Sequence, residues 1–487
     1  MESKEVDRIA PKGHLMQELW KLTASRVVEL LKRREVSPRE LIDVAASRIA
    51  DTNPRINSIV TLCLDRAYER AKRLESKPAT DIPPHYLYGL PIAIKDNFDV
   101  SGVRTTSGSR IYADRIAPAS DIVVERLEAN GAIVAGKTNM PEFAAGGNTF
   151  NDVFGATRNP WDTRMTSGGS SGGAAAALAA GQVWLANGGD FGGSIRQPAS
   201  FCSVTGLRPS AGMVPKAQKQ PFSPLSVEGP MARTVADCAL MFDAEAGFHR
   251  LDPLSQVGPH PSFVAAAARP QRPRRVAFSA DLGIARAVHK EVRELCRAAA
   301  EKLSRDGVTV EEAHPDLSDA EETFLTLRGA VFIARHAQLI EKYRHLYKPE
   351  IIKNTAFGLS LKAADIVAAD IAQGELIRRA AQFFEDYDLL LCPVVTCPPF
   401  DVNQRYPEEV DGVHFEGYMG WLILTYAITV TACPAFSLPC GFTRDGLPVG
   451  LQVVGKPRGE AALFSAAAYI EALLGVASLT PIDPRSA

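Results

Sequence analysis

The chain has 487 residues, of which 46% are hydrophobic and 23% charged, with a formal net charge of −2 at pH 7. This composition predicts a large globular protein of one or two domains, and the near-zero charge provides no general attraction to nucleic acid or anionic lipid. Residues 1–13 show no apolar stretch typical of a signal peptide, and no window approaches the roughly 18 uninterrupted apolar residues of a membrane span. We therefore expect small-molecule chemistry in the cytoplasm.

The first quarter of the chain predicts helices over residues 15–34, 38–49 and 65–75. Ser37 precedes the second helix as its cap, Pro38 takes the first helical position and Glu40 lies three residues after the cap. Thr52-Asn53-Pro54 is expected to end this helix, because proline interrupts helical hydrogen bonding. A proline-rich link over 78–84 follows.

The rest of the chain alternates apolar runs with helical patterns. Short runs at 90–94 and 133–137 predict buried strands, with a helix at 119–130 before the second. From 148 to 212 the chain is dense in Gly, Ser and Asn, with a helix at about 172–180, and so long an irregular segment usually belongs to a functional site. Beyond it we expect strands at 276–279, 389–395, 435–438 and 450–454, and helices at 287–305, 320–346, 360–386 and 459–474.

This alternation predicts an α/β fold in which a central mixed, mostly parallel β-sheet is covered by helices on both faces. The Pro/Arg-rich stretch 253–274 is interpreted as a connection between two halves of one sheet. We expect a single domain (1–487) with a helical N-terminal portion (1–85), a core carrying the chemistry (86–250) and a second half completing the sheet (251–487).

The eight cysteines are predicted to be buried free thiols of a cytoplasmic protein. They are scattered through apolar surroundings, and the closest pair, Cys392 and Cys397, has no second pair of zinc ligands nearby. No metal site is predicted.

Three features carry chemistry: Lys95 at the end of an apolar strand, Ser170-Ser171 within Ser-Gly-Gly-Ser-Ser-Gly-Gly, and Ser194 after two glycines. A lysine at a strand end is usually solvated. If Lys95 is buried, its pKa falls from roughly 10.4 toward neutrality, and the neutral amine then accepts a proton.

The glycine-rich stretch around Ser170 matches the Gly-x-Ser-x-Gly pattern of a nucleophile elbow, but we reject that interpretation. An elbow needs an apolar strand before the serine, whereas residues 159–164 are polar and turn-like. None of the nine histidines lies in a recognisable catalytic setting. The stretch also lacks the Gly-Lys-Ser/Thr ending of a nucleotide-binding loop.

Around Ser194 the spacing suits acyl transfer. Consecutive glycines let successive N–H groups converge, as an oxyanion hole requires, and the candidate donors are the amides of Phe191, Gly192, Gly193 and Ser194. On these residues alone, a plain glycine turn with a capping serine is an equally good interpretation.

Taken together, the three features resemble the amidase signature family, and the resemblance covers most of the chain. It begins with the helical opening 41–60. The matching motifs are Gly-Leu-Pro-Ile-Ala-Ile-Lys-Asp-Asn (89–97), Gly-Lys-Thr-Asn-Met-Pro-Glu-Phe (136–143), the serine–glycine loop (167–173), Gly-Gly-Ser-Ile-Arg-Gln-Pro-Ala (192–199), Gly-Leu-Arg-Pro (206–209), Glu-Gly-Pro-Met-Ala-Arg-Thr-Val (228–235) and Gly-Leu-Pro-Val-Gly-Leu-Gln (446–452).

The resemblance implies a serine hydrolase that needs no metal or cofactor. Ser194 is then the nucleophile, Lys95 the base and Ser170 the bridge between them, with a cis peptide bond expected at Gly169-Ser170. Supporting roles follow for three further residues: Asp190 and Arg196 are expected to pair and fix the nucleophile loop, and Ser171 to donate a hydrogen bond near the site.

The chain departs from the commonest family pattern at Gly189 and Phe191, where many members carry Ser or Thr and a small or hydroxyl residue. The backbone donor at 191 survives this change, and the side chain suggests recognition of apolar groups. Residues 211–227 also differ and are expected to form a rim of the pocket.

The substrate is expected to be an aryl or alkyl amide. Carbamates (urethanes) and esters remain alternatives because the same acyl-enzyme chemistry serves all three. A further alternative is the glutaminase subunit of a tRNA-dependent amidotransferase, although no charged pair for an amino acid's ammonium and carboxylate is recognisable in the sequence. By resemblance alone we expect a homodimer.

Overall fold

The computed structural model describes residues 18–75, 85–257 and 262–486, and helices α2 (Ala24–Lys32), α3 (Pro38–Ile56) and α4 (Leu64–Glu75) open this part of the chain. The predicted cap of α3 is confirmed: Glu40 N donates to Ser37 Oγ (3.2 Å) and Ser37 N donates to the Glu40 carboxylate (2.7 Å). The start of the predicted first helix lies outside the described residues. Its described part is interrupted, because a 3₁₀ turn at Leu19–Lys21 precedes a new cap at Thr23.

The predicted end of α3 is wrong, because the helix continues through Pro54 to Ile56. The chain leaves the helix at Asn57, which adopts a left-handed conformation (φ 50°) and donates its N–H to Asn53 O (2.7 Å). The Asn53 side chain accepts the N–H groups of Ser58 (2.8 Å) and Ile59 (3.0 Å). The Asn57 bond satisfies one terminal carbonyl of the helix three residues beyond the proline, and the Asn53 side chain fixes the residues that follow.

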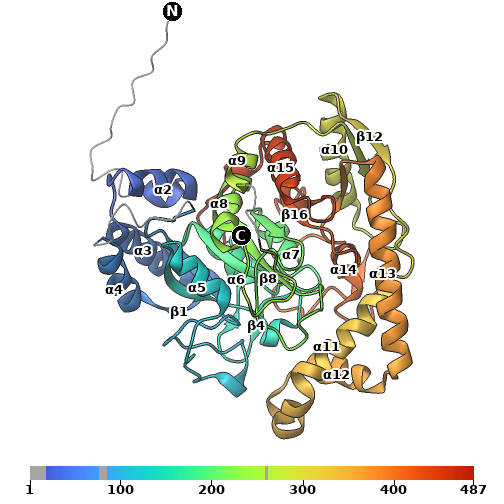
Figure 1. Ribbon diagram of the computed structural model, residues 1–487, viewed down its shortest axis with the longest axis horizontal. Coiled ribbons are helices and arrows are strands. Elements are labelled where there is room, and N and C mark those ends of the chain that lie inside the picture. Colours follow the sequence, from blue (N-terminus) through green and yellow to red (C-terminus); the bar gives the residue numbers. More distant parts are fainter. Residues whose placement is uncertain (1–17, 76–84, 258–261, 487) are drawn as a thin grey trace, which may run out of the picture.

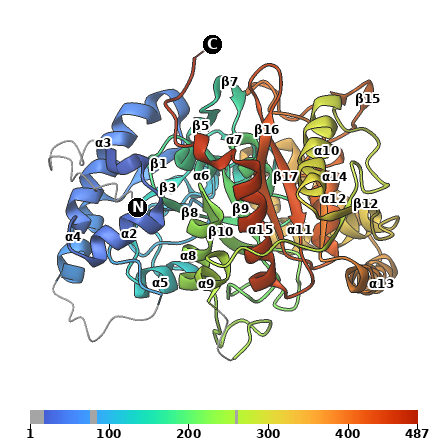
Figure 2. The same cartoon turned by 90° about the horizontal axis from the view of Figure 1, so that it is seen from above.

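An eleven-stranded sheet runs through the molecule in the order β1-β3-β2-β8-β10-β9-β16-β17-β13-β11-β12 (Figures 1 and 2). The strands are β1 (Ile59–Leu62), β2 (Pro91–Lys95), β3 (Ile133–Thr138), β8 (Leu185–Asp190), β9 (Thr205–Arg208), β10 (Val227–Ala232), β11 (Arg275–Phe278), β12 (Thr309–Glu312), β13 (Leu389–Pro393), β16 (Ala435–Phe442) and β17 (Pro448–Val454). The α/β class and the mixed sheet are therefore confirmed. Strands from the two halves of the chain meet where β9 pairs with β16.

The sheet is less parallel than predicted. Among the described residues, four neighbouring pairs run parallel (β2–β3, β2–β8, β11–β12 and β11–β13) and six run antiparallel. The difference arises mainly at β8, β9 and β10, which lie antiparallel side by side in a region where no strand was predicted. Glycine, asparagine and proline are poor strand formers, so burial in the middle of the sheet stabilises these strands, not local propensity.

Helices cover both faces of the sheet, as predicted. They are α5 (Ile122–Ala129), α6 (Gly172–Ala179), α7 (Arg196–Cys202), α8 (Val235–Glu245), α9 (Phe263–Ala267), α10 (Lys290–Arg305), α11 (Ala320–Tyr343), α12 (Pro349–Ser360), α13 (Ala363–Asp386), α14 (Ile423–Val430) and α15 (Glu460–Leu474). Along β2 successive side chains alternate between faces: Ala93 packs with the alanines of α6, whereas Ile92 and Ile94 belong to the core that contains α8.

Helices α11, α12 and α13 lie at the end of the molecule away from α2–α5 (Figure 1). Helix α12 was not predicted, and α9 lies inside the stretch expected to be a linker, where it packs against α8 and α15. In the described ranges no helix is both long and apolar enough to cross a membrane. All eight cysteines are buried and free, as predicted.

Candidate active site

The sheet topology brings two of the predicted site segments to one edge. Strands β2 and β8 are parallel neighbours, so their carboxyl ends, at Lys95 and Asp190, lie at the same edge of the sheet. The Ser170 loop leads into α6, and the Ser194 loop joins β8 to α7. Lys95 thus ends β2, Ser170 lies just before α6, and Ser194 lies between the end of β8 and the start of α7.

Lys95 is buried (1% exposed), and its Nζ donates to the Oγ atoms of Ser170 (2.7 Å) and Ser171 (2.9 Å). Burial lowers the pKa of Lys95 to about 7, although the Asp190 charge opposes this change. Desolvation disfavours the charged ammonium form of Lys95. The two serines are neutral, so they do not offset this cost of burial. A substantial fraction of Lys95 is therefore neutral at physiological pH.

Ser170 follows a cis peptide bond at Gly169-Ser170, as expected from the resemblance. The loop around it is tightly enclosed. Gly169 N donates to Gln197 Oε1 (2.6 Å), and a Cβ at Gly169 would lie 2.7 Å from Gly146 O. The surrounding backbone therefore fixes the position of the Ser170 hydroxyl and leaves no room for a side chain before it.

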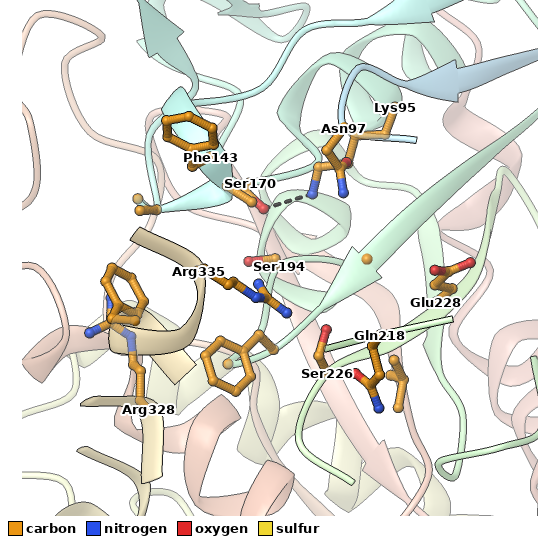
Figure 3. A pocket seen from close by; sticks show the side chains of 18 of the residues that line it. Lys95, Asn97, Phe143, Ser170, Ser194, Gln218, Ser226, Glu228, Arg328 and Arg335 are labelled. Atoms are coloured by element: carbon orange, nitrogen blue, oxygen red, sulfur yellow. Dashed lines mark hydrogen bonds between the residues drawn. The ribbon is translucent and has the colours of Figure 1, made fainter. Parts of the chain in front are cut away.

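Ser194 lies beside this pair and is partly exposed. It lines a cavity of about 270 Å³ that Lys95 and Ser170 also line, and Figure 3 shows the three side chains directed toward one another. Ser171 N donates to Ser194 O (3.1 Å), so the two serine loops are joined through the backbone. Ser171 thus supports the site through its amide, and its hydroxyl accepts from Lys95.

One of the four amides predicted for an oxyanion hole has another partner. Gly193 N donates to Asp190 Oδ1 (2.9 Å), which corrects its predicted role. Among the described residues the amides of Phe191, Gly192 and Ser194 have no hydrogen-bond acceptor, and all three residues line the cavity. Unpaired N–H groups beside the serine are the arrangement that binding a developing oxyanion requires.

Asp190 and Arg196 pair as expected, and both are fully buried. Arg196 donates to both carboxylate oxygens of Asp190 (3.0 and 2.9 Å), while Arg208 donates to Asp190 Oδ1 at 3.3 Å. Burial alone would raise the pKa of Asp190, but the charges and hydrogen bonds of the two guanidinium groups hold it well below its usual range. The carboxylate also accepts Ile195 N (3.2 Å), so this pair sets the backbone on both sides of Ser194.

Arg196 also connects the Ser194 loop to the second half of the chain. It donates to Thr425 O (2.9 Å) and Thr429 Oγ1 (2.9 Å) on α14, and to Gln452 Oε1 (2.6 Å) on β17. Thr425 Oγ1 in turn donates to Gly192 O (2.8 Å).

The cavity has two chemically different ends, on opposite sides of Ser170 and Ser194 (Figure 3). One end is aromatic: Phe143 and Phe332 pack against His336, and Arg328 lies over the rings of Phe332 and Tyr418. The other is polar, with Gln218, Ser226 and Glu228, and with Lys216, which donates to Ser226 O. Arg335 lies beside Ser194, over the Phe191 ring, and also lines a neighbouring hollow with Gln218 and Ser226. Residues 216–218 and 226–227 line the cavity, in agreement with the rim predicted for 211–227.

Sequence reasoning missed the contribution of α11. Phe324, Arg328, Phe332 and His336 recur every four residues and so share one face of this helix, which lines the cavity. The sequence contained this periodicity, but it had no signal for which face meets the site. His336 is packed between Phe143 and Phe332 (ring centroids at 5.0 and 5.3 Å), and burial lowers its pKa to about 3. In the described ranges no group of three or more His, Cys, Asp or Glu residues is arranged to hold a metal ion.

Comparison with known proteins assigns the chain to a family. The amidase family profile matches residues 40–464, which include Lys95, Ser170 and Ser194. The chain belongs to the amidase signature family. Within this family it is a hydrolase acting on carbon–nitrogen bonds.

Two relatives and one solved structure illustrate the similarity. An acylamidase of Rhodococcus erythropolis is 34% identical over 471 residues, covering 96% of this chain and 98% of the relative. A glutamyl-tRNA(Gln) amidotransferase subunit from Moorella thermoacetica is 36% identical over 479 residues, covering 93% and 97%. The crystal structure of a bacterial aryl acylamidase of the amidase signature family superposes with a TM-score of 0.87 at 28% identity, covering 95% of this chain and 99% of that one.

Proposed function

We propose that this amidase hydrolyses a carboxylic amide through an acyl-enzyme on Ser194, with Ser170 and Lys95 as a proton relay. The observation that carries the proposal is the buried contact of Lys95 Nζ with Ser170 Oγ (2.7 Å) in the cavity that Ser194 lines. A lysine with a pKa of about 7 is suited to accept a proton at physiological pH.

In the first step Ser194 Oγ attacks the amide carbon and passes its proton to Ser170 Oγ, which releases its own proton to the Lys95 lone pair. The carbonyl electron pair moves onto oxygen, where the amides of Phe191, Gly192 and Ser194 are placed to stabilise it. When this intermediate collapses, the carbon–nitrogen bond breaks and the protons return from Lys95 through Ser170 to the leaving nitrogen.

In the second step water attacks the acyl carbon and gives a proton to the same relay. The bond from Ser194 Oγ to the acyl carbon then breaks, and Ser194 recovers its proton from Ser170. The products are a carboxylic acid and an amine, and no metal or cofactor takes part in the proposed steps.

We propose an aryl or alkyl amide as the substrate. The aromatic end of the cavity suits a planar or apolar group, because ring–ring contacts add to the hydrophobic gain. The similarity to an acylamidase and an aryl acylamidase supports the same choice. Carbamates and esters stay as alternatives, since they would form their acyl-enzymes by the same steps.

The glutaminase alternative draws support from the 36% identity to the amidotransferase protein of Moorella thermoacetica. The cavity also holds arginines and carboxylates, which the sequence alone did not reveal. In that role the protein would need partner subunits. For a hydrolase acting without other subunits we propose a homodimer, in the cytoplasm, where eight free thiols are compatible with a reducing compartment.

The proposal is tested by labelling purified protein with a fluorophosphonate and mapping the adduct by mass spectrometry. We expect the adduct on Ser194 and a fall in kcat/KM of at least about 10⁴-fold in Ser194→Ala, because removing the nucleophile abolishes the covalent route. Ser437→Ala is the matched control, since this buried hydroxyl has no hydrogen-bond partner among the described residues and lies on β16. An adduct elsewhere, or an active Ser194→Ala protein, would contradict the proposal.

The substrate class is decided by a hydrolysis panel of anilides, aliphatic amides, carbamates, esters and glutamine on the same protein. We expect the highest kcat/KM for an anilide or aliphatic amide. Preferred hydrolysis of glutamine, or co-purification of partner subunits, would favour the amidotransferase role instead.

A further inference from the structure

The polar end of the cavity contains a carboxylate without a partner. Glu228 is 8% exposed, and its Oε2 atom is buried without a hydrogen-bond partner among the described residues. No described cation forms an ion pair with it. Lys216, the cation on the same side of the cavity, donates instead to Ser226 O. A buried carboxylate normally has its oxygens satisfied, because leaving them without donors carries a large desolvation cost.

The fold directs this carboxylate toward the substrate cavity. Glu228 lies on β10 opposite Gly189 of β8, so no side chain occupies the neighbouring position across the strands. Glu228 and Gly189 both line the cavity, and Figure 3 shows Glu228 on the side away from Phe143 and Arg328. Burial raises the pKa of Glu228, although the Lys216 charge opposes this change, and a bound cation would favour the charged form further. Glu228 therefore lies in the part of the cavity wall that a bound ligand contacts, with one carboxyl oxygen lacking a donor.

We propose that Glu228 is a specificity-determining residue that binds an amino group of the substrate. The inference rests on the proposed amidase function and adds that one portion of the substrate carries an amino group. Ser194 and Ser170 lie between the two ends of the cavity, so a bound amide directs its acyl and amine portions to opposite ends. The portion that reaches the polar end carries a protonated amine, which satisfies Glu228 by a charge-assisted hydrogen bond.

A preference over neutral analogues follows from the same contact. A neutral substrate brings no donor to Glu228 and gains nothing there, whereas an amine-bearing substrate is stabilised by the charge-assisted hydrogen bond. A site of this kind discriminates strongly between substrates that differ by a single N–H group. The enzyme is therefore expected to prefer amine-bearing amides to their neutral parents.

The test compares two matched substrate pairs. On the acyl side the pair is butyryl-4-nitroanilide and 4-aminobutyryl-4-nitroanilide; on the amine side it is acetanilide and N-acetyl-4-(aminomethyl)aniline. In the wild-type protein we expect kcat/KM for the amine-bearing member of one pair to exceed that of its parent at least tenfold. In Glu228→Gln this preference falls below threefold, while the neutral parent changes less than threefold.

Glu245→Gln is the matched control, because Glu245 is also buried without hydrogen-bond partners among the described residues but lies on α8 and not in the cavity. It should keep the wild-type preference. Glu228→Asp retains the carboxyl group on a shorter side chain and should keep part of the preference for the amine-bearing substrate. It provides a second variant if Glu228→Gln folds poorly. An unchanged preference in both Glu228 variants, or an equal loss for parent and amine, would overturn the inference.

Failure of the proposed function is distinguishable from failure of this inference. If the wild-type protein hydrolyses none of the four probes, binding is measured instead, as the shift in Tm produced by 4-aminobutyramide and by butyramide. A larger shift with the amine that disappears in Glu228→Gln supports the inference without any turnover. Equal shifts with the two amides would overturn it.

Discussion

At the scale of single residues, the proposed chemistry depends on a lysine that is shielded from water. Lys95 is enclosed by the sheet and two serine loops, and the hydroxyl groups that contact it carry no charge. The neutral amine is therefore accessible at physiological pH. Histidine, the more usual residue for proton transfer in this pH range, is present in the cavity as His336, but its aromatic surroundings hold its pKa at about 3.

The Lys95 pKa predicts a pH profile. Because the relay requires the neutral amine, kcat/KM should rise about tenfold per pH unit below pH 7 and level off above it, as the neutral fraction approaches one. Lys95→Arg, which stays protonated, should lower kcat/KM by about 10²–10⁴-fold at every pH. Rates between pH 5.5 and 9 on 4-nitroacetanilide measure this, with thermal melting to confirm folding. A profile that is flat from pH 5.5 to 9 would rule out Lys95 as the base.

At the scale of elements, the loop between β8 and α7 is fixed by a buried ion pair. Asp190 accepts hydrogen bonds from Gly193 N and Ile195 N, on either side of Ser194, and from two nitrogens of the Arg196 guanidinium group. The loop geometry therefore depends on one carboxylate. The same bonds explain why only some of the loop amides are left for the substrate.

Asp190→Asn should both unfold the protein more easily and lower its activity. The change leaves two buried guanidinium groups facing a neutral amide, and breaking a buried pair typically costs about 3–5 kcal/mol. We expect a lower Tm in calorimetry and a fall in kcat that exceeds the change in KM. Asp162→Asn is the control, because its Arg164 partner is largely exposed and such pairs contribute less than about 1 kcal/mol. Equal losses of stability in the two variants would show that the Asp190 pair has no special role.

Elements with strong local signals were predictable from the sequence, whereas those stabilised by distant contacts were not. The cap at Ser37 and the apolar runs of β2 and β3 led to correct assignments. Strand β8 contains Asn187-Gly188-Gly189, which on its own indicates a turn, and it is a strand because β2 and β10 enclose it. For the candidate site, motifs predicted Lys95, Ser170 and Ser194, which the fold brings together. Glu228 and the α11 residues required the fold, since only tertiary packing determines which side chains face a cavity.

At the scale of the whole molecule, we propose that the chain is one folding unit. The β9–β16 pair joins strands from both halves, and Arg196 of the first half bonds to α14 and β17 of the second. Neither half retains a complete sheet without the other. The predicted portions 1–85, 86–250 and 251–487 are thus expected to be regions of a single domain.

This proposal predicts a single unfolding transition. In a urea titration, far-UV circular dichroism, tryptophan fluorescence and activity should share one midpoint, because separate probes coincide when no intermediate is populated. Hydrogen exchange of the β2 and β13 amides, one strand from each half, should give similar opening free energies. Two resolved midpoints, or a β13 that opens well before β2, would indicate two units.

The bonds of Arg196 have a consequence for how this enzyme tolerates mutation. The three proposed catalytic side chains all come from residues 95–194, yet the groups that hold the nucleophile loop come from Thr425, Thr429 and Gln452. A genetic screen for inactive variants should therefore recover positions in α14 and β17 alongside the catalytic residues. Such variants would keep Lys95, Ser170 and the cavity unchanged. Their defect would be a displaced Ser194 hydroxyl, caused by the loss of the bonds that hold its loop.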